Sequence, residues 1–201
     1  MPHLLELFSG TGSMGRAFED IGWEVTSVDL NYKSCPTIHC DVLELTAEEV
    51  LEHGNVTLIW ASPPCTHYSC ARTYAKTPRD LEGSDRLVAK VLDLADELNC
   101  YYIIENPHSG LLKTRPVVQG IPMKVVDYCR YGAAYRKRTA LWTHSTYEPA
   151  RPLCNKDCAS SDGKKHTRKA QRSGPGFHHS VDAPCATHHP PPQLHPARAE
   201  S

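Results

Sequence analysis

The chain has 201 residues, 40% of them hydrophobic and 22% charged, which suits one globular domain with its own core and excludes a large second domain. Its net charge of -1 hides an asymmetry, because residues 1–150 carry 14 Lys and Arg against 19 Asp and Glu, whereas residues 151–201 carry 8 against 4. An acidic body argues against broad, non-specific binding to phosphates, so any nucleic-acid contact must come from local clusters of Lys and Arg.

Strands and helices are expected to alternate in the N-terminal half of the chain. This expectation comes from the spacing of apolar residues and from the turn-forming residues between them. In chain order, the predicted elements are a strand at Pro2–Phe8, a glycine turn at Ser9–Ser13, a helix at Met14–Ile21, a strand at Glu24–Val28, a helix-like acidic stretch at Thr46–His53 and a strand at Val56–Trp60.

The pattern continues with a longer helix and three more strands. Ser84–Asn99 places apolar residues on one helical stripe, with Ser84 as its expected N-cap. A buried strand follows at Tyr101–Ile104, and Val125–Cys129 and Thr139–Thr143 form a closing pair of strands. The sequence thus predicts an α/β fold with a doubly wound, mostly parallel sheet, helices on both faces and ligands at the carboxyl ends of its strands.

The composition changes at about Arg151. The last quarter holds 7 of the 16 prolines, 6 of the 12 histidines and Phe177 as its single aromatic residue, so it cannot build a core alone. We therefore expect a main domain at 1–150, a basic extension containing Cys and His at 151–187, and a disordered tail at 188–201.

We expect a soluble, intracellular protein. No apolar run approaches the length of a membrane span, and the N-terminus does not resemble a secretion signal. The compartment would be the cytoplasm of a bacterium or, for a eukaryotic or viral host, the nucleus. In such a setting the nine cysteines are reduced and act as core residues, metal ligands or nucleophiles.

The first predicted turn has the spacing of a nucleotide-binding loop. Gly10, Gly12 and Gly15 satisfy G-x-G-x-x-G directly after a strand, and Asp29 ends the second strand. Glycines let the backbone approach a ligand closely, and a carboxylate at that position accepts hydrogen bonds from ribose hydroxyls. The pattern fits a dehydrogenase as well as a methyltransferase, and an ordinary strand-to-helix turn would look the same.

Further candidate residues follow later strands. Cys65 comes after Pro63 and Pro64 at the end of a strand, where a rigidly held thiolate is a candidate nucleophile, although inert packing is the alternative. Glu105 follows the next buried strand and can act as a proton donor at the same sheet edge, or as a turn cap. Arg136 and Arg138 lie on one side of an extended chain, suited to a phosphate or a pyrimidine carbonyl, or simply solvated.

The order of these motifs resembles that of cytosine-5 DNA methyltransferases. It consists of Leu-Glu-Leu-Phe-Ser-Gly-Thr-Gly-Ser at 5–13, Pro-Pro-Cys at 63–65, Glu-Asn at 105–106, and Tyr-Gly followed by Arg-x-Arg at 131–138. The resemblance covers roughly residues 4–143 and implies a Rossmann-like, S-adenosylmethionine-dependent methyltransferase domain acting on DNA. The cofactor-binding residues that it implies are Phe8, Gly10, Gly12, Asp29, Asp41 and Pro63.

The resemblance also implies a mechanism. Carbon 5 of cytosine is too poor a nucleophile to accept a methyl group directly, so Cys65 would add to carbon 6 and create an enamine. Glu105 would support ring nitrogen 3, and Arg136 or Arg138 would hold the base. The base must leave the duplex, because Cys65 cannot reach carbon 6 inside the stack, and flipping costs on the order of a few kcal/mol.

Three features depart from the family pattern. The glutamate motif reads Glu-Asn-Pro where Glu-Asn-Val is usual, and Ala134 stands where Gln is usual. The long target-recognition region between the arginine motif and the final helix is missing, as in some short phage and viral relatives. Sequence specificity therefore has no visible location, and a protein partner for target recognition is one way to supply it.

The segment in place of that region contains a possible zinc site. Thiolate and imidazole ligands at these separations suit tetrahedral zinc, although scattered surface residues would give the same sequence. The expected ligands are Cys129, Cys154, Cys158 and His166. The neighbouring basic residues would then meet DNA phosphates, or otherwise form a solvated tail. These are Lys164, Lys165, Arg168, Lys169 and Arg172.

The leading hypothesis is an active DNA (cytosine-5-)-methyltransferase. A second is a catalytically weak binding module that keeps the cofactor fold and serves a partner, which the intact Pro-Pro-Cys and Glu-Asn motifs argue against. A third is the same chemistry on RNA or on a free nucleotide. A dehydrogenase would leave Pro63-Pro64-Cys65 unexplained.

Overall fold

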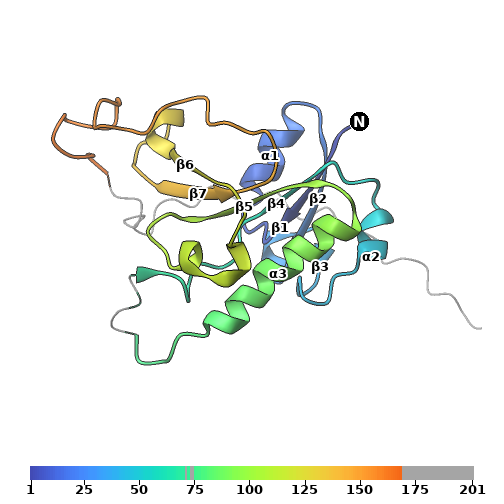
Figure 1. Cartoon of the computed structure of the whole chain (residues 1–201). Helices are drawn as coiled ribbons and strands as arrows, with labels where there is room; N and C mark the ends of the chain where they lie inside the picture. Colours follow the sequence, from blue (N-terminus) through green and yellow to red (C-terminus); the bar gives the residue numbers. More distant parts are fainter. Residues whose placement is uncertain (71, 73–74, 169–201) are drawn as a thin grey trace, which may run out of the picture.

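Seven strands form one mixed sheet in the computed structural model, which describes residues 1–70, 72 and 75–168 (Figure 1). The strand order is β3-β2-β1-β4-β5-β7-β6. The strands are β1 (His3–Leu7), β2 (Glu24–Asp29), β3 (Ile38–His39), β4 (Leu58–Ala61), β5 (Tyr101–Pro107), β6 (Met123–Asp127) and β7 (Arg138–Trp142). Neighbours among β1 to β5 run parallel, whereas β7 is antiparallel to both β5 and β6. The predicted doubly wound, mostly parallel sheet is confirmed.

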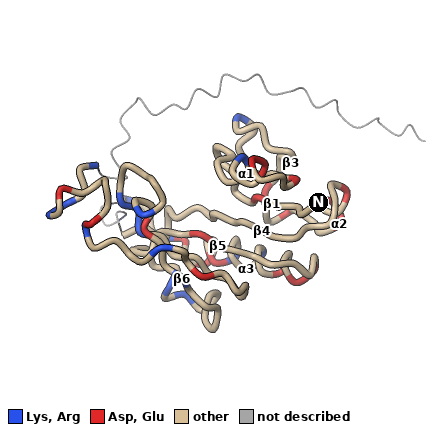
Figure 2. The backbone as a smooth tube through the Cα atoms, turned by 90° about the horizontal axis from the view of Figure 1, so that it is seen from above, with Lys and Arg blue, Asp and Glu red and all other residues tan. Residues whose placement is uncertain are grey.

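Helices lie on both faces of this sheet. They are α1 (Ser13–Glu19), α2 (Ala47–Leu51) and α3 (Leu81–Glu97), and Figure 2 shows α1 and α3 on opposite sides of β1 and β4. Alternation along β1 explains the arrangement, because side chains of one strand point alternately to the two faces. Leu5 and Leu7 join the core cluster that contains α2 and α3 residues, whereas the Glu6 carboxylate accepts a hydrogen bond from the N–H of Gly15 in α1 (3.1 Å).

Several predicted boundaries were wrong. The strand predicted at Val125–Cys129 runs instead from Met123 to Asp127, and two further differences bear on the site. Helix α3 begins at Leu81 and not near Ser84, because the Asp80 carboxylate accepts the N–H of Gly83 (2.7 Å) and caps the helix four residues before the predicted cap. The Ser84 hydroxyl instead donates to the Asp80 carbonyl (2.9 Å). Strand β5 continues through Pro107, because its last residues pair with β7. The Glu-Asn motif is therefore held within the sheet.

The remaining described segments are short or irregular. Short 3-10 turns connect the main elements and include η1 (Tyr32–Ser34), η3 (Leu112–Thr114), η4 (Pro116–Val118) and η5 (Tyr128–Tyr131). Between 151 and 168 there is no helix or strand, and an isolated bridge joins Ser161 to His166. The predicted tail at 188–201 lies outside the described residues, as do Lys169 and Arg172. None of the helices within the described part of the chain is long and apolar enough to cross a membrane.

Candidate functional site

The predicted cofactor turn follows β1 and is tied to the end of β2. Three of its residues have left-handed backbone conformations, with φ of 57° at Phe8, 51° at Gly10 and 64° at Gly12. Glycine adopts this region without steric cost, and the chain turns sharply there before α1 begins. One oxygen of Asp29 accepts the N–H of Gly10 (2.7 Å) and the other accepts the N–H of Asn31 (2.7 Å). The Asp29 carboxylate therefore stands directly beside the glycine backbone.

The other predicted cofactor residues follow the neighbouring strands. Asp41 comes two residues after β3 and accepts the N–H of Leu43 (3.0 Å), and the buried Pro63 comes two residues after β4. Because β3, β2, β1 and β4 are adjacent and parallel, all six predicted residues lie at one edge of the sheet. Exposed backbone at the glycine turn, two carboxylates and a buried proline are groups that suit a nucleoside with a ribose.

The loop that carries Cys65 is anchored on both sides. Before Cys65, the carbonyl of Pro63 accepts a hydrogen bond from the Asn106 side chain of β5 (3.0 Å). After it, Tyr68 is fully buried and its hydroxyl donates to Asp85 of α3 (2.8 Å). Arg79 adds hydrogen bonds to the carbonyls of residues 67 and 69. The half-buried Cys65 thus lies in a short span that the sheet and α3 hold from both ends.

We expect Tyr68→Phe to lower the free energy of unfolding by about 1 to 2 kcal/mol, because Asp85 loses a buried hydrogen bond while the ring still fills its site. Asp85 keeps its ion pair with Arg115 (2.7 Å), so the loss is confined to one bond. Urea denaturation measures the difference. Tyr101→Phe is the control, since that side chain is exposed and should change nothing. Equal stabilities of the two variants would contradict an anchoring role for the Tyr68 hydroxyl.

Glu105 is buried within β5, and its carboxylate has two partners that the sequence did not indicate. One oxygen accepts hydrogen bonds from the Lys137 ammonium group (2.9 Å) and from the Tyr128 hydroxyl (3.3 Å). The same ammonium group lies 5.0 Å from the centre of the Tyr128 ring. Partial burial acts to lower the pKa of Lys137, but the neighbouring Glu105 carboxylate raises it above its usual value. A charged lysine therefore holds the Glu105 carboxylate.

The predicted base-holding arginines face a different carboxylate. Arg138 makes two hydrogen bonds to the fully buried Asp127 side chain (3.0 and 2.7 Å), and Arg136 adds a third (3.3 Å). Burial would raise the pKa of Asp127, but the hydrogen bonds from Arg138, the Cys154 N–H and Arg136 lower it to about 2. Strand alternation separates Lys137 from its two neighbours, so it is Lys137 that reaches Glu105.

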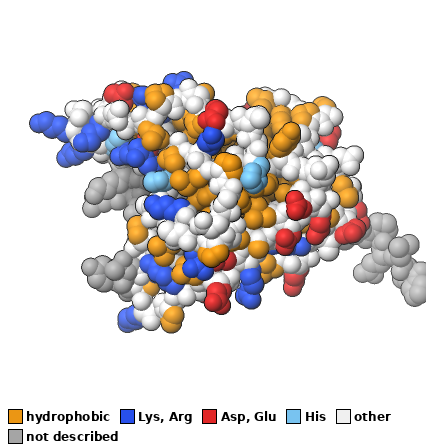
Figure 3. All heavy atoms as spheres, in the orientation of Figure 1, with side chains coloured by type: hydrophobic (Ala, Val, Ile, Leu, Met, Phe, Trp, Pro, Cys, Tyr) orange, Lys and Arg blue, Asp and Glu red, His pale blue; other side chains and the backbone are white. Residues whose placement is uncertain are grey.

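A cleft of about 830 Å³ brings several of these groups together. The cleft is lined by Cys65, by residues 107–109 at and after the end of β5, and by residues 135–138 before and in β7. Lys165, His166 and Arg168 complete the lining. Figure 3 shows Lys and Arg side chains gathered toward the left end of the visible face, where Figure 1 places the C-terminal segment. The Cys65 thiol and a set of cations therefore share one opening at the carboxyl edge of the sheet.

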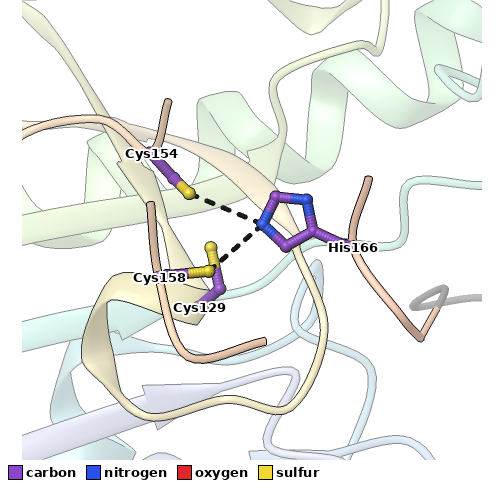
Figure 4. A group of neighbouring side chains, drawn as sticks. All are labelled: Cys129, Cys154, Cys158 and His166. Carbon is purple, nitrogen blue, oxygen red and sulfur yellow. Dashed lines mark hydrogen bonds between the residues drawn. The ribbon is translucent and has the colours of Figure 1, made fainter. Parts of the chain in front are cut away.

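The predicted metal ligands form a cluster beside this cleft. The ligand atoms of Cys129, Cys154, Cys158 and His166 all lie within 4.8 Å of one another. Figure 4 shows the imidazole Nε2 directed at two of the sulfurs, at 3.5 Å from Cys154 and 3.3 Å from Cys158. The cluster, which we call the Cys3His cluster, joins η5 to the C-terminal segment and can hold a metal ion.

Comparisons with known proteins point to one family. No model of a known protein family matches the chain. A curated relative described as "Probable DNA (cytosine-5)-methyltransferase", from Frog virus 3 (isolate Goorha), is 35% identical over 156 residues, which cover 70% of this chain and 69% of the relative.

Solved structures of methyltransferases have a similar fold. A candidate DNA modification methyltransferase encoded within an E. coli prophage matches with a TM-score of 0.55 and 19% identity over 71% of this chain and 46% of that one. The Entamoeba histolytica methyltransferase EhMeth matches with a TM-score of 0.57 and 15% identity over 76% of this chain and 56% of that one. S. pombe Dnmt2 methyltransferase matches with a TM-score of 0.53 and 17% identity over 82% of this chain and 58% of that one. The chain spans about half the length of these three proteins.

Proposed function

The chain belongs to the DNA (cytosine-5)-methyltransferase family, and from this premise we propose that it transfers a methyl group from S-adenosylmethionine to carbon 5 of cytosine in DNA. The observation that carries the proposal is the pairing of Cys65 with the Glu105-Asn106 motif. Asn106 anchors the Cys65 loop through the Pro63 carbonyl, and its neighbour Glu105 contacts Lys137, which lines the same cleft as Cys65. Cys65 and the lysine partner of the buried Glu105 carboxyl group thus share one opening, and addition to a pyrimidine ring requires both a nucleophile and a proton donor.

S-adenosylmethionine would lie over the glycine turn. The groups available there are the backbone at Gly10 and Gly12, the Phe8 ring, the Asp29 and Asp41 carboxylates and the buried Pro63. Asp29 would accept hydrogen bonds from the ribose hydroxyls, and Asp41 from the adenine amino group. Bound there, the cofactor supplies an electrophilic sulfonium methyl group.

In the proposed reaction, the Cys65 thiolate forms a bond to carbon 6 of a cytosine that has left the duplex. The Glu105 carboxylate first takes up a proton from solvent and passes it to ring nitrogen 3, so the electron pair of the ring collects at carbon 5 as an enamine. Carbon 5 would then take the methyl group as its bond to the sulfonium sulfur breaks, and that sulfur would keep the electron pair and leave as a thioether. Loss of the carbon 5 proton to a base expels the Cys65 thiolate, and return of the nitrogen 3 proton to the Glu105 carboxylate restores the neutral aromatic ring.

Lys137 would assist by positioning Glu105 and by facing the flipped base. Its ammonium group already contacts the Glu105 carboxylate at 2.9 Å and lines the cleft. Arg136 and Arg138 also line the cleft, and their bonds to Asp127 fix the direction of the chain on each side of Lys137. We therefore assign the role of holding the base to Lys137. The two arginines would act as residues that position Lys137.

We also propose that the Cys3His cluster holds a structural zinc ion. A tetrahedral zinc ion with bonds of about 2.3 Å to sulfur and 2.0 Å to nitrogen separates its ligand atoms by roughly 3.5 to 3.8 Å. The distances from the imidazole nitrogen to Cys154 and Cys158 are 3.5 and 3.3 Å. The N–H of Lys156 also donates to the Cys154 sulfur (3.3 Å), a contact that suits a thiolate ligand.

We expect Asp29→Ala to weaken S-adenosylmethionine binding about 10- to 100-fold, because hydrogen bonds to a charged acceptor contribute about 1.5 to 3 kcal/mol. The Gly10 turn also loses its tie to β2. Isothermal titration calorimetry measures the dissociation constant. Asp93→Ala, which removes an exposed carboxylate from α3, is the control and should bind like the wild type. Unchanged affinity in Asp29→Ala would exclude the proposed ribose contact.

Tritiated S-adenosylmethionine tests the whole proposal. The protein is offered duplex DNA, RNA and free dCTP in parallel, and transferred label is counted after separation of the products. We expect label in duplex DNA, on carbon 5 of cytosine after digestion to nucleosides. Label in RNA or dCTP instead would mean that the same chemistry acts on that substrate and not on DNA. Absence of label from all three would favour a binding module that keeps the fold.

A further inference from the structure

The segment 151–168 has little besides the Cys3His cluster to hold it against the domain. Among its residues only Cys154 is buried, and no helix or strand is formed there. Its other described attachments are polar, such as the ion pair between Asp157 and Arg130 (3.1 Å) and the bond from the Ser160 hydroxyl to the Ala133 carbonyl (2.8 Å). Burial of apolar surface cannot fix such a segment, whereas four ligands to one metal ion can.

The cluster is physically joined to the cleft that contains Cys65. His166 belongs to both, because it is a cluster residue and part of the cleft wall. The N–H of Cys154 donates to the same Asp127 oxygen that Arg138 contacts, at 2.9 and 2.7 Å. A metal ion at the cluster would therefore fix the C-terminal segment and the start of β7 relative to each other.

Two cations near His166 face the opening. Lys165 and Arg168 are exposed and line the cleft. Within the part of the chain that the structure describes, neither makes an ion pair. Figure 2 shows basic residues on the C-terminal segment, in contrast to the acidic residues near α2. Free cations beside a pocket for a flipped base suit the phosphates that flank that base.

Resting on the proposed function, we propose that zinc at the Cys3His cluster builds the basic wall of the cleft, and that Lys165 and Arg168 on this wall bind the phosphates of double-stranded DNA. Metal loading then controls DNA affinity, while the sheet and the glycine turn bind S-adenosylmethionine without it. In this chain the zinc-held segment thus provides DNA contacts at the position where the family's recognition region is missing.

The first test uses the full chain and compares Cys158→Ser with Cys100→Ser. Both cysteines are half-buried, but only Cys158 belongs to the cluster. Elemental analysis measures bound zinc, fluorescence anisotropy measures binding of a labelled DNA duplex, and calorimetry measures S-adenosylmethionine binding. We expect wild type and Cys100→Ser to carry equimolar zinc. Cys158→Ser should lose the zinc and bind DNA on the order of tenfold more weakly, with unchanged S-adenosylmethionine affinity.

A second variant distinguishes the contribution of the two cations from that of the metal ion. Lys165→Ala combined with Arg168→Ala should keep the zinc, and the slope of log affinity against log salt should fall by about 2, one for each lost phosphate contact. A purified wild type without zinc, a zinc-free Cys158→Ser that binds DNA like the wild type, or RNA bound more tightly than duplex DNA would each overturn the proposal. Methyl transfer is measured on the same samples, so inactivity with intact zinc and DNA binding would count against the proposed function alone.

Discussion

Replacing Cys65 with alanine should lower methyl transfer to DNA by at least about 10⁴-fold, because removal of a covalent nucleophile leaves carbon 5 of cytosine without activation. S-adenosylmethionine binding should be unchanged, since the proposed cofactor residues lie at the glycine turn, at the end of β2, after β3 and at Pro63, which Asn106 holds in place. The loop should also keep its place, because Asn106 and Tyr68 anchor it on either side of residue 65. Transfer of tritium to duplex DNA and calorimetry measure the two properties.

Cys70→Ala is the matched control, because it changes a second cysteine after the same strand, and we expect it to keep activity. A covalent intermediate gives a further readout. With duplex DNA that carries 5-fluorocytosine, fluorine at carbon 5 cannot leave as a proton, so the wild type should remain attached to DNA on a denaturing gel, and Cys65→Ala should not. Substantial methylation by Cys65→Ala would sink the covalent mechanism and leave the family assignment intact.

The alternation of strands and helices was predictable from the sequence, except for the two-residue strand β3 (Ile38–His39), whereas several boundaries depended on tertiary pairing. Apolar periodicity located the glycine turn, α3 and the buried strands, because each of these signals is local. The end of β5 is not a local property, since Glu105, Asn106 and Pro107 become strand residues only by pairing with β7. The start of α3 depended on a choice between two local caps, and the carboxylate of Asp80 takes that position.

Some features of the candidate site could likewise be predicted from the sequence, and others depended on the fold. The cluster of Cys129, Cys154, Cys158 and His166 could be proposed from the sequence because few residue types bind zinc, and the fold brings these four together. Lys137 was missed because the family motif is Arg-x-Arg, so the sequence pointed to the two arginines beside it. Which of three consecutive cations reaches Glu105 depends on the face that each presents, and that face is fixed only by the pairing of β7 with β5 and β6.

Asp127 has a role that no motif indicated. It is the last residue of β6, and its side chain is buried. Its carboxylate accepts hydrogen bonds from Arg136, Arg138 and the N–H of Cys154. A buried carboxylate with several charged donors is costly to leave unpaired, so its partners are held in fixed positions. The Asp127 carboxylate thus orients Arg136 and Arg138, which line the cleft.

Replacing Glu105 with glutamine should lower the turnover of methyl transfer by about 10² to 10⁴-fold, because the variant keeps the shape of the side chain but loses the proton that supports ring nitrogen 3. An amide oxygen can still accept the hydrogen bond from Lys137, so the cleft should keep its form. We expect unchanged S-adenosylmethionine binding and a small change in DNA affinity. Single-turnover transfer of tritium to duplex DNA isolates the chemical step from product release.

Glu148→Gln is the matched control, because Glu148 also pairs with a lysine, Lys124, but on the exposed surface. It should keep wild-type turnover, since an exposed ion pair contributes little to stability. Lys137→Gln adds a second comparison, because Lys137 is proposed both to position the Glu105 carboxyl group and to hold the base. Its loss should therefore shift the pH dependence of turnover and also lower the maximum. If Glu105→Gln instead methylates DNA at the rate of Glu148→Gln, the carboxyl group is a structural part of β5, and Cys65 must act without its proton.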